Sequence, residues 1–174
     1  GSNWTTTERD QNGFGTSSVV NSVYAQGDNI YVGTTAGISI STDGGNSWTA
    51  TGRGENGFSV ANALAGNVVE VNSVFAGGNT VYAGMAEGIS ISTDGGANWT
   101  TTQSGVNGFA NGSVLSIYAD GDKVYAGTFN GGLSISTDGG VNWNTISPNP
   151  NNNTIPAVFA EGDMVYVGTS GGGA

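Results

Sequence analysis

The side chains whose spacing most clearly suggests chemistry are three aspartates, each set between a serine and a glycine pair and followed by a tryptophan. The first copy spans Ser41–Trp48 and reads Ser-Thr-Asp-Gly-Gly-Asn-Ser-Trp. A carboxylate in this setting can accept hydrogen bonds from turn N–H groups, and the glycines adopt positive φ without steric cost. The pattern therefore predicts a tight hairpin corner. A calcium site is the alternative, but one carboxylate per corner falls far short of the roughly 6–8 oxygen ligands that Ca²⁺ takes.

Each corner follows a strand of alternating apolar and polar residues, as in Gly37–Ser41, and its tryptophan opens a return strand. The side chains predicted to build the three corners are Ser41, Asp43, Gly45, Trp48, Ser92, Asp94, Gly96, Trp99, Ser136, Asp138, Gly140 and Trp143.

Composition excludes several classes of function. The 174 residues contain no Cys and no His, which rules out disulfides, thiolate metal sites and Ser/His/Asp or Cys/His catalysis. The net charge is −10, with only three basic residues, so nucleic acid and anionic membrane surfaces are not expected partners. No apolar run approaches the roughly 20 residues of a membrane-spanning helix. We expect no cofactor and no metal.

Internal repeats predict the fold. The tryptophans Trp4, Trp48, Trp99 and Trp143 are spaced 44, 51 and 44 residues apart, which is the length of a four-stranded propeller blade. Short alternating segments joined by Gly-Asp or Gly-Asn turns complete each unit as an antiparallel meander. We therefore predict one all-β domain over residues 1–174, a β-propeller of four-stranded antiparallel blades. Its units cover approximately residues 19–51, 70–102, 114–146, and 155–174 together with 3–7.

The three corners resemble the Asp-box, or bacterial neuraminidase repeat, whose pattern is S-x-D-x-G-x-[TS]-W. The first copy has Ser47 before its tryptophan, whereas the others depart from the pattern with Asn98 and Asn142. The resemblance implies a β-propeller in which the corner joins the third and fourth strands, away from the active face. The family includes sialidases, xyloglucanases, sortilin-type receptors and photosystem II assembly factors, so the fold does not fix a function.

The two ends of the sequence give an incomplete unit. Residues 3–7 read as a fourth strand without earlier partners, and the chain closes on a second strand without a third. The N-terminal strand would complete the last blade, so that this blade is split between the termini. Three explanations stay open: a fragment of a longer repeat protein, two chains sharing partial blades in a larger ring, or residues 170–174 serving as a degenerate third strand. We favour a homo-oligomer over a closed monomer because an unpaired sheet edge invites association.

A second repeated element is Asn-Gly-Phe, which ends ten residues after each of the first three tryptophans. These segments are predicted to share one face with nearby arginines and to form shallow sites for a neutral glycan or a protein, with aromatic faces packing on the ligand and amides binding hydroxyls. The alternative is that Asn-Gly makes a turn and the Phe fills space between blades. The candidate ligand-binding residues are Phe14, Phe58, Phe109, Asn12, Asn56, Asn107, Arg9 and Arg53.

Catalysis is not expected. A sialidase-like site needs three arginines for the substrate carboxylate, and the chain has two. A glycoside hydrolase of the xyloglucanase kind needs two carboxylates about 5–9.5 Å apart. Glu8 or Asp10 could pair with Glu55 across neighbouring blades, although solvated loop charge is their default role.

The resulting prediction is a non-catalytic propeller, a scaffold or recognition module that binds glycan or protein and is extracellular or attached to the cell surface. The tyrosines of the second strands (Tyr31, Tyr82, Tyr125 and Tyr166) and the tryptophans are predicted to pack between blades. The alternatives are a fragment of an Asp-box glycoside hydrolase, and an engineered or excised repeat fragment that assembles into a larger propeller without native activity.

Overall fold

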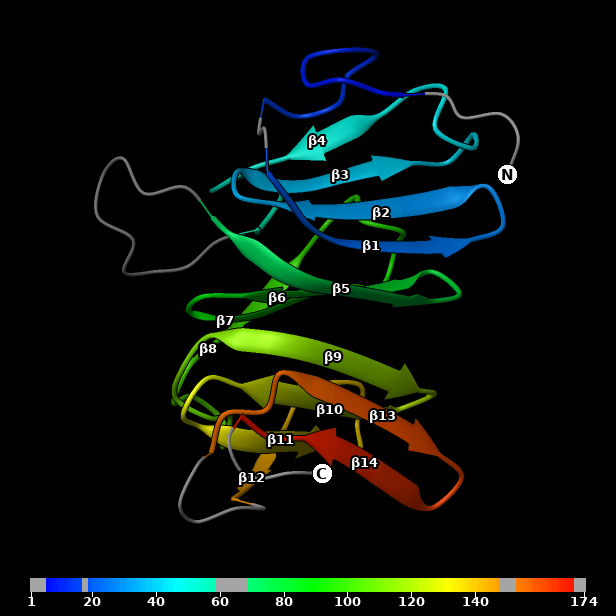
Figure 1. The fold of residues 1–174 in the computed structure, drawn as a ribbon. Helices are drawn as coiled ribbons and strands as arrows, with labels where there is room; N and C mark the ends of the chain where they lie inside the picture. The colour runs from blue at the N-terminus through cyan, green and yellow to red at the C-terminus, as the bar shows by residue number, and fades with distance from the viewer. Residues whose placement is uncertain (1–5, 17–18, 59–68, 148–152, 171–174) are drawn as a thin grey trace.

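The computed structural model describes residues 6–16, 19–58, 69–147 and 153–170, and within these ranges the chain is all-β, with fourteen strands and no helix (Figure 1). The strands form three four-stranded antiparallel sheets and one two-stranded sheet, each ordered as in the sequence. Sheet 1 contains β1 (Val20–Gln26), β2 (Asn29–Thr34), β3 (Gly37–Ser41) and β4 (Thr49–Thr51). Sheet 2 contains β5 (Val71–Gly77), β6 (Thr80–Met85), β7 (Gly88–Ser92) and β8 (Thr100–Gln103). Sheet 3 contains β9 (Val114–Asp120), β10 (Lys123–Thr128), β11 (Gly132–Ser136) and β12 (Asn144–Ile146), and sheet 4 contains β13 (Ala157–Glu161) and β14 (Met164–Gly168).

The strands take their register from the alternation of side chains. In sheet 1, Tyr31 of β2 lies opposite Tyr24 of β1 and Ile40 of β3, so three apolar side chains meet in one row across the sheet. Sheet 2 repeats the row with Phe75, Tyr82 and Ile91. A slip of one residue would move every such side chain to the opposite face, and the repeated pattern therefore fixes the pairing.

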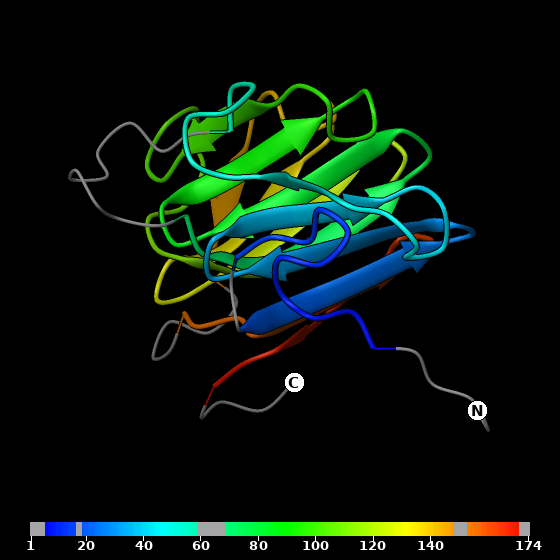
Figure 2. The ribbon, with the colours of Figure 1, turned by 90° about the horizontal axis from the view of Figure 1, so that it is seen from above.

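The sheets follow one another as blades, and the core lies between them. The first strand of each sheet packs on the first two strands of the sheet before it, as β5 does on β1 and β2 (Figures 1 and 2). Three separate clusters of buried apolar residues fill the spaces between sheets 1 and 2, 2 and 3, and 3 and 4. Because both faces of the inner sheets are covered, serines that alternate with the apolar residues, such as Ser90 and Ser134, are buried as well.

A column of aromatic rings crosses from sheet to sheet, with one ring from the first strand of each of the four sheets. Tyr24, Phe75, Tyr118 and Phe159 occupy equivalent positions, and successive ring centroids lie 4.8, 5.3 and 4.9 Å apart. These distances fall in the range of favourable tilted and edge-to-face contacts. The column therefore ties the repeated sheets together along one line.

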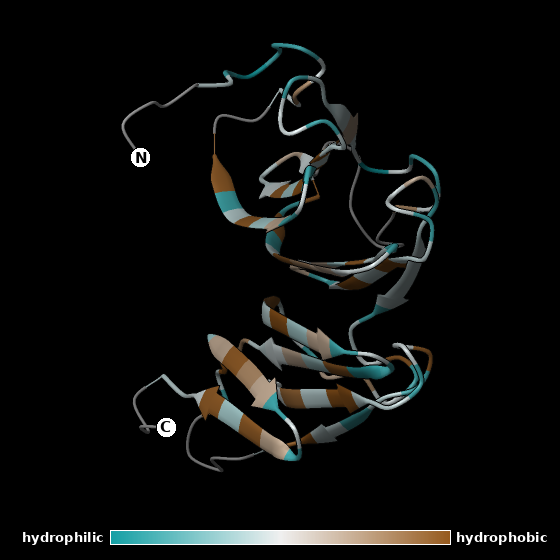
Figure 3. Cartoon of the chain, turned by 90° about the vertical axis from the view of Figure 1, so that its right-hand side faces the viewer, coloured by the Kyte–Doolittle hydropathy of each residue, from teal (hydrophilic) through white to brown (hydrophobic). Residues whose placement is uncertain are grey.

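The described sheets form an open arc, not a closed ring. Sheet 1 and sheet 4 lie at opposite ends of the series, and in the described part of the chain the extensive contacts between sheets join successive sheets (Figures 1 and 3). The predicted last blade is therefore represented by two strands. The strand expected at residues 3–7 falls mostly outside the described residues, and Thr6 and Thr7 are not in a strand. The segment that follows them packs on sheet 1.

We predict that Gly84→Ala lowers the free energy of unfolding by about 1–3 kcal/mol, because a Cβ at this position would overlap Val114 of sheet 3 and overpack the contact. Gly77→Ala is the matched control, since a Cβ there meets nothing within 4 Å. Urea denaturation at one protein concentration measures both changes. Equal stability of the two variants would contradict this account of the contact between sheets 2 and 3.

Candidate functional site

The aspartate corners connect the third and fourth strands of sheets 1 to 3. In the first corner, Ser41 Oγ donates to Asp43 Oδ1 at 2.8 Å and accepts from the Gly45 N–H at 2.8 Å. The Ser47 N–H donates to the same carboxylate oxygen at 2.9 Å, and Trp48 Nε1 donates to the Gly45 carbonyl at 3.1 Å. The carboxylate thus accepts bonds from both sides of the turn and holds the indole against it.

The other two corners repeat this arrangement. Asn98 and Asn142 depart from the Asp-box pattern, and each donates through Nδ2 to the aspartate of its corner, Asp94 or Asp138, at 2.8 Å. The Ser47 hydroxyl makes the equivalent bond to Asp43 in the first corner. The substitution of Asn for Ser therefore keeps the second bond to each carboxylate.

These hydrogen bonds lower the pKa of each corner aspartate to about 2. The largest cause is the Ser47 hydroxyl for Asp43, the Asn98 side chain for Asp94, and the Asn142 backbone N–H for Asp138. Hydrogen bonds to the charged form favour it. The three carboxylates are ionised at neutral pH and cannot serve as proton donors there.

The second glycine of a corner also lies at the contact between sheets. Gly96 has a φ of +100°, and a Cβ there would overlap the Ile40 side chain of sheet 1. A Cβ added to Gly140 would overlap the Ile91 side chain of sheet 2 in the same way. The corner therefore needs glycine for its backbone conformation and for the approach of the neighbouring sheet.

The Asn-Gly-Phe segments lie along the outer strand of the following sheet. Asn56 and Gly57 have φ values of 49° and 84°, the conformation of a turn with two left-handed residues. The Asn56 carbonyl accepts from the Trp99 N–H at 2.8 Å, and the Gly57 carbonyl accepts from the Thr101 hydroxyl at 3.3 Å. The segment therefore covers part of an edge that would otherwise be open to association.

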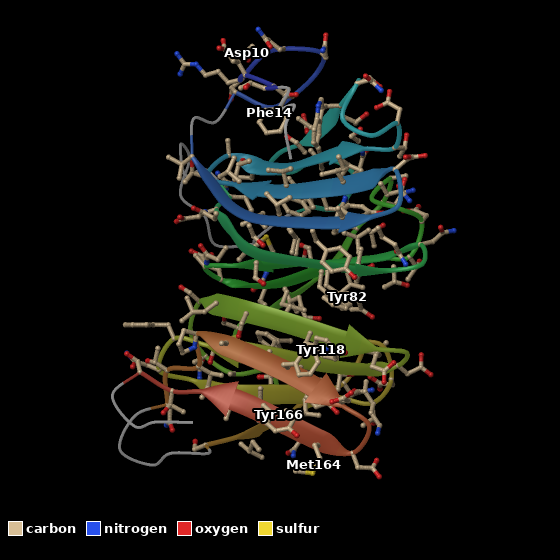
Figure 4. The ribbon with its side chains drawn as sticks, turned by 45° about the vertical axis from the view of Figure 1, so that its right-hand side comes forward. Asp10, Phe14, Tyr82, Tyr118, Met164 and Tyr166 are labelled. Atoms are coloured by element: carbon tan, nitrogen blue, oxygen red, sulfur yellow. The ribbon has the colours of Figure 1, made fainter. Side chains whose placement is uncertain are left out.

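Each phenylalanine packs at a steep angle against the tryptophan of the sheet that follows it in the chain. The ring centroids of these three pairs lie 4.8–4.9 Å apart. Phe14, Phe58 and Phe109 are 8%, 0% and 3% exposed, so their faces are not available to a ligand. Figure 4 shows Phe14 beneath the N-terminal segment. Their burial leaves little of the surface that the predicted ligand contacts require, because each ring packs at a steep angle against a tryptophan. The alternative reading, in which Phe fills space in the fold, matches their positions.

The other candidate residues have separate positions. Asn12, Asn56 and Asn107 are exposed, but each uses its carbonyl to accept the N–H of a corner tryptophan. Arg9 and Arg53 are exposed in the loops before these asparagines. The structure therefore distributes the eight candidates over three segments, one beside the outer strand of each of sheets 1 to 3.

A groove between sheets 2 and 3 was missed by sequence reasoning. Its volume is about 430 Å³, and its walls are β8 on one side and the third corner with Val106 and Asn107 on the other. Val106 is 45% exposed and Val141 is 64% exposed, so two solvent-exposed aliphatic side chains border the groove. The polar lining consists of Thr93, Asp94, Asn98, Thr100, Thr101, Thr102 and Asn107.

The equivalent groove between sheets 1 and 2 is smaller, about 210 Å³, and the corner residue on its wall is Ala97. The sequence carried a signal for this difference. The residue after the glycine pair is Asn46, Ala97 or Val141 in otherwise similar corners. The residue before the Asn-Gly turn varies likewise from Gln11 to Glu55 to Val106. Val106 precedes sheet 3 and Val141 lies in the corner of sheet 3, and the structure brings both valines to one groove.

The carboxylates considered for hydrolysis lie on exposed loops. Glu55 Oε2 accepts from the Gly52 N–H at 2.8 Å within its own turn, and Glu8 and Asp10 are exposed in the N-terminal segment. Among the residues that the structure describes, no group of three or more acidic side chains could hold a metal ion. No helix in these ranges is long and apolar enough to cross a membrane.

Comparisons with known proteins show the fold. The extracellular domain of a putative one-component system, BT4673 from B. thetaiotaomicron, matches with a TM-score of 0.70 at 20% identity, over 94% of this chain and 22% of that one. An ancestral GH74 enzyme matches with a TM-score of 0.59 at 25% identity, over 80% of this chain and 20% of that one. YCF48 bound to D1 peptide matches with a TM-score of 0.57 at 19% identity, over 80% of this chain and 44% of that one.

These neighbours are β-propeller proteins, and the chain has the fold of a propeller built from blade-like sheets. It spans about a fifth of the first-matched enzyme's length. No protein-family model matches the sequence, and no curated protein matches it significantly.

We predict that the corners make stability fall in acid. Their folded-state pKa of about 2 lies below the ordinary 3.8, so their contribution is fully present above pH 3.8 and is lost as the pH falls towards 2. The triple variant with Asp43→Asn, Asp94→Asn and Asp138→Asn should be less stable at neutral pH and should lose less stability over this interval. Urea midpoints across the interval measure the effect. An unchanged slope in the triple variant would contradict the proposed role of the carboxylates.

A second prediction concerns the Asn-Gly-Phe segments. Phe58→Ala removes a fully buried ring and should lower the free energy of unfolding by about 3–5 kcal/mol. Phe129→Ala is the control, since Phe129 is 52% exposed and should change little. If thermal unfolding showed no loss for Phe58→Ala, the ring would not be a packing residue.

Proposed function

We propose that this chain is a non-catalytic recognition module, and that the groove between β8 and the third corner binds an uncharged or basic segment of another protein. The observation that carries the proposal is the pair of exposed aliphatic side chains, Val106 and Val141, on one wall of a groove of suitable size. Pockets for small ligands and side chains are typically about 300–1,000 Å³ in volume.

The chemistry of the groove favours a peptide ligand. Val106 and Val141 would lose their contact with water against a small apolar side chain, and this loss of exposed surface favours binding. Threonine hydroxyls and the amides of Asn98 and Asn107 would pair with backbone groups. The outer strand β8 also forms one wall of the groove, and its threonine side chains are part of the polar lining.

Charge narrows the class of ligand further. Asp94 lines the groove and is ionised at neutral pH, and the whole chain carries a net charge of −10. An acidic ligand would be repelled at moderate ionic strength. A neutral or basic segment meets no such penalty.

A neutral glycan is less favoured for this groove. Sugar rings pack well on exposed aromatic faces, and the aromatic residue of the lining, Trp99, is only 6% exposed. A hydrolase is less favoured because the corner carboxylates have lowered pKa values, whereas a general acid needs a raised one.

The neighbours are compatible with this reading. They include extracellular domains of putative bacterial one-component and hybrid two-component systems, and a propeller solved with a bound peptide. By this likeness we propose an extracellular location for the chain. The GH74 neighbour keeps a hydrolase fragment as the alternative function.

The proposal is tested with a displayed library of random peptides selected on the folded chain. We expect neutral or basic sequences with a small aliphatic residue. We expect Val106→Asn combined with Val141→Asn to weaken their binding by at least about tenfold, since uncharged amides replace the apolar wall. Ala97→Asn is the matched control, because it changes the same corner position beside the smaller groove.

Three outcomes would count against the proposal. Selected peptides that bind the double variant as tightly as the parent chain would place binding elsewhere. Binding on a neutral glycan array, without peptide binding, would favour the glycan reading. Hydrolysis of a β-glucan would favour the enzyme alternative.

A further inference from the structure

A second cavity, of about 300 Å³, lies between the turn that joins β5 to β6 and the turn that joins β9 to β10. It shares no residue with the groove beside β8. Its lining includes Phe75, Gly77, Thr80, Tyr82, Gly121 and Asp122. Sheets 2 and 3 are neighbours and each has four described strands. The cavity therefore belongs to a contact inside the arc.

The space in this cavity comes from two small residues of sheet 2. Gly77 ends β5, and a Cβ added to it would meet nothing within 4 Å. Thr80 begins β6 and pairs with Gly77. In sheet 3 the equivalent pair is Asp120 and Lys123, whose side chains are longer. The cavity is therefore specific to the contact between sheets 2 and 3 and does not follow from the repeat itself.

Three oxygen-bearing side chains line the cavity, and they are Thr80, Tyr82 and Asp122. Within the part of the chain that the structure describes, none of the three makes a side-chain hydrogen bond or an ion pair with another residue. Tyr82 is only 3% exposed, because its ring packs between sheets 2 and 3 (Figure 4). A buried polar group without a protein partner favours a ligand that can bond to it.

The cavity carries a negative charge, which comes from Asp122. Burial and, to a smaller extent, the Asp122 charge raise the pKa of the Tyr82 hydroxyl, so the carboxylate acts on this hydroxyl across the cavity. The hydroxyl stays uncharged at neutral pH, and its oxygen can accept a hydrogen bond. The net charge of the whole chain is −10, which also attracts cations. Both properties favour a positively charged ligand that donates hydrogen bonds.

The contact between sheets 3 and 4 places an ammonium group beside the equivalent aspartate. Asp163 follows the turn glycine of sheet 4 as Asp122 follows that of sheet 3, and Lys123 takes the position of Thr80. Lys123 Nζ lies 3.8 Å from Asp163 Oδ1. The chain thus supplies an ammonium at one contact, whereas the preceding contact has a short hydroxyl side chain and an open space.

We propose that the cavity between these two turns binds a primary ammonium group on an aliphatic stem. A primary ammonium has three N–H donors and no acceptor, which matches the three oxygen-bearing side chains of the lining. The ring of Phe75 offers a surface for the stem and a favourable contact for the cation. Three such side chains are too few for Ca²⁺, which takes roughly 6–8 oxygen ligands. The ammonium comes either from a free amine or from a lysine of another protein.

The experiment is an NMR titration of the isotope-labelled full chain with n-butylammonium chloride at constant ionic strength. The backbone amides of Gly77 and Gly121 report on the cavity, because both glycines line it. We expect saturable shifts of both amide signals. Butyltrimethylammonium keeps the charge and the stem but has no N–H donor, so it should bind at least about tenfold more weakly.

Variants of the lining test each oxygen group. Asp122→Asn should weaken butylammonium binding by at least about tenfold, because it removes the charged acceptor. Asn79 takes the equivalent turn position in sheet 2, so this variant keeps a residue that the fold accepts. Asp28→Asn is the matched control, since it removes the same charge from the equivalent turn of sheet 1 and should leave binding unchanged. Tyr82→Phe removes only a hydroxyl and should weaken binding by about threefold to tenfold.

A further variant fills the site from within the chain. Thr80→Lys introduces the residue type that sheet 3 carries at the equivalent position, Lys123. The new ammonium should reach Asp122 as Lys123 reaches Asp163, and butylammonium binding should be lost. Thr80→Ser keeps the hydroxyl and should preserve binding.

Two peptides distinguish the sources of the ammonium. A capped Gly-Lys-Gly peptide that binds more tightly than butylammonium would support a lysine of another protein as the ligand. A peptide that binds equally or more weakly would support a free amine. The acetyl-lysine form of the peptide has no ammonium, and its binding with equal affinity would overturn the proposal.

The proposal fails if butylammonium gives no saturable shift at Gly77 and Gly121, or if butyltrimethylammonium binds as tightly. It also fails if Asp28→Asn weakens binding as much as Asp122→Asn, because net charge alone would give that result. The groove variants at Val106 and Val141 should leave the titration unchanged. Failure of this proposal is therefore distinguishable from failure of the proposed peptide groove.

Discussion

The contact between the second-strand tyrosine of one sheet and the aliphatic side chains at the start of the next sheet is the interaction on which the arc depends. Each of these sheets is too thin to form a core alone, and the buried clusters lie between sheets, not within them. A glycine two residues after the tyrosine lets Val71, Val114 or Ile155 of the next sheet approach closely. Burial of large apolar side chains at such contacts is the main favourable term in folding. The stability of each sheet is therefore linked to that of its neighbours, as in other repeat proteins.

The outer side of the arc is organised by polar interactions. The serine and aspartate of each corner satisfy the turn N–H groups, and the indole N–H is bonded to the glycine carbonyl. The Asn-Gly-Phe segment then packs its ring on the indole and its backbone on the edge strand. These groups connect one sheet to the loop that arrives from the sheet before it. These contacts explain why both motifs recur together, because each ring packs on the indole of a corner.

The sequence alone determined the repeat, the strands and the corner chemistry. The spacing of Trp48, Trp99 and Trp143 and the alternation around Ile38 and Ile40 are local properties, and local spacing fixes hairpins and register. Only the tertiary structure decided which partner each side chain meets. Phe58 follows Trp48 by ten residues in the sequence, yet it packs on Trp99, because the loop crosses to the next sheet. Val106 and Val141 are likewise distant in the sequence, and the packing of sheet 3 on sheet 2 brings them to one groove.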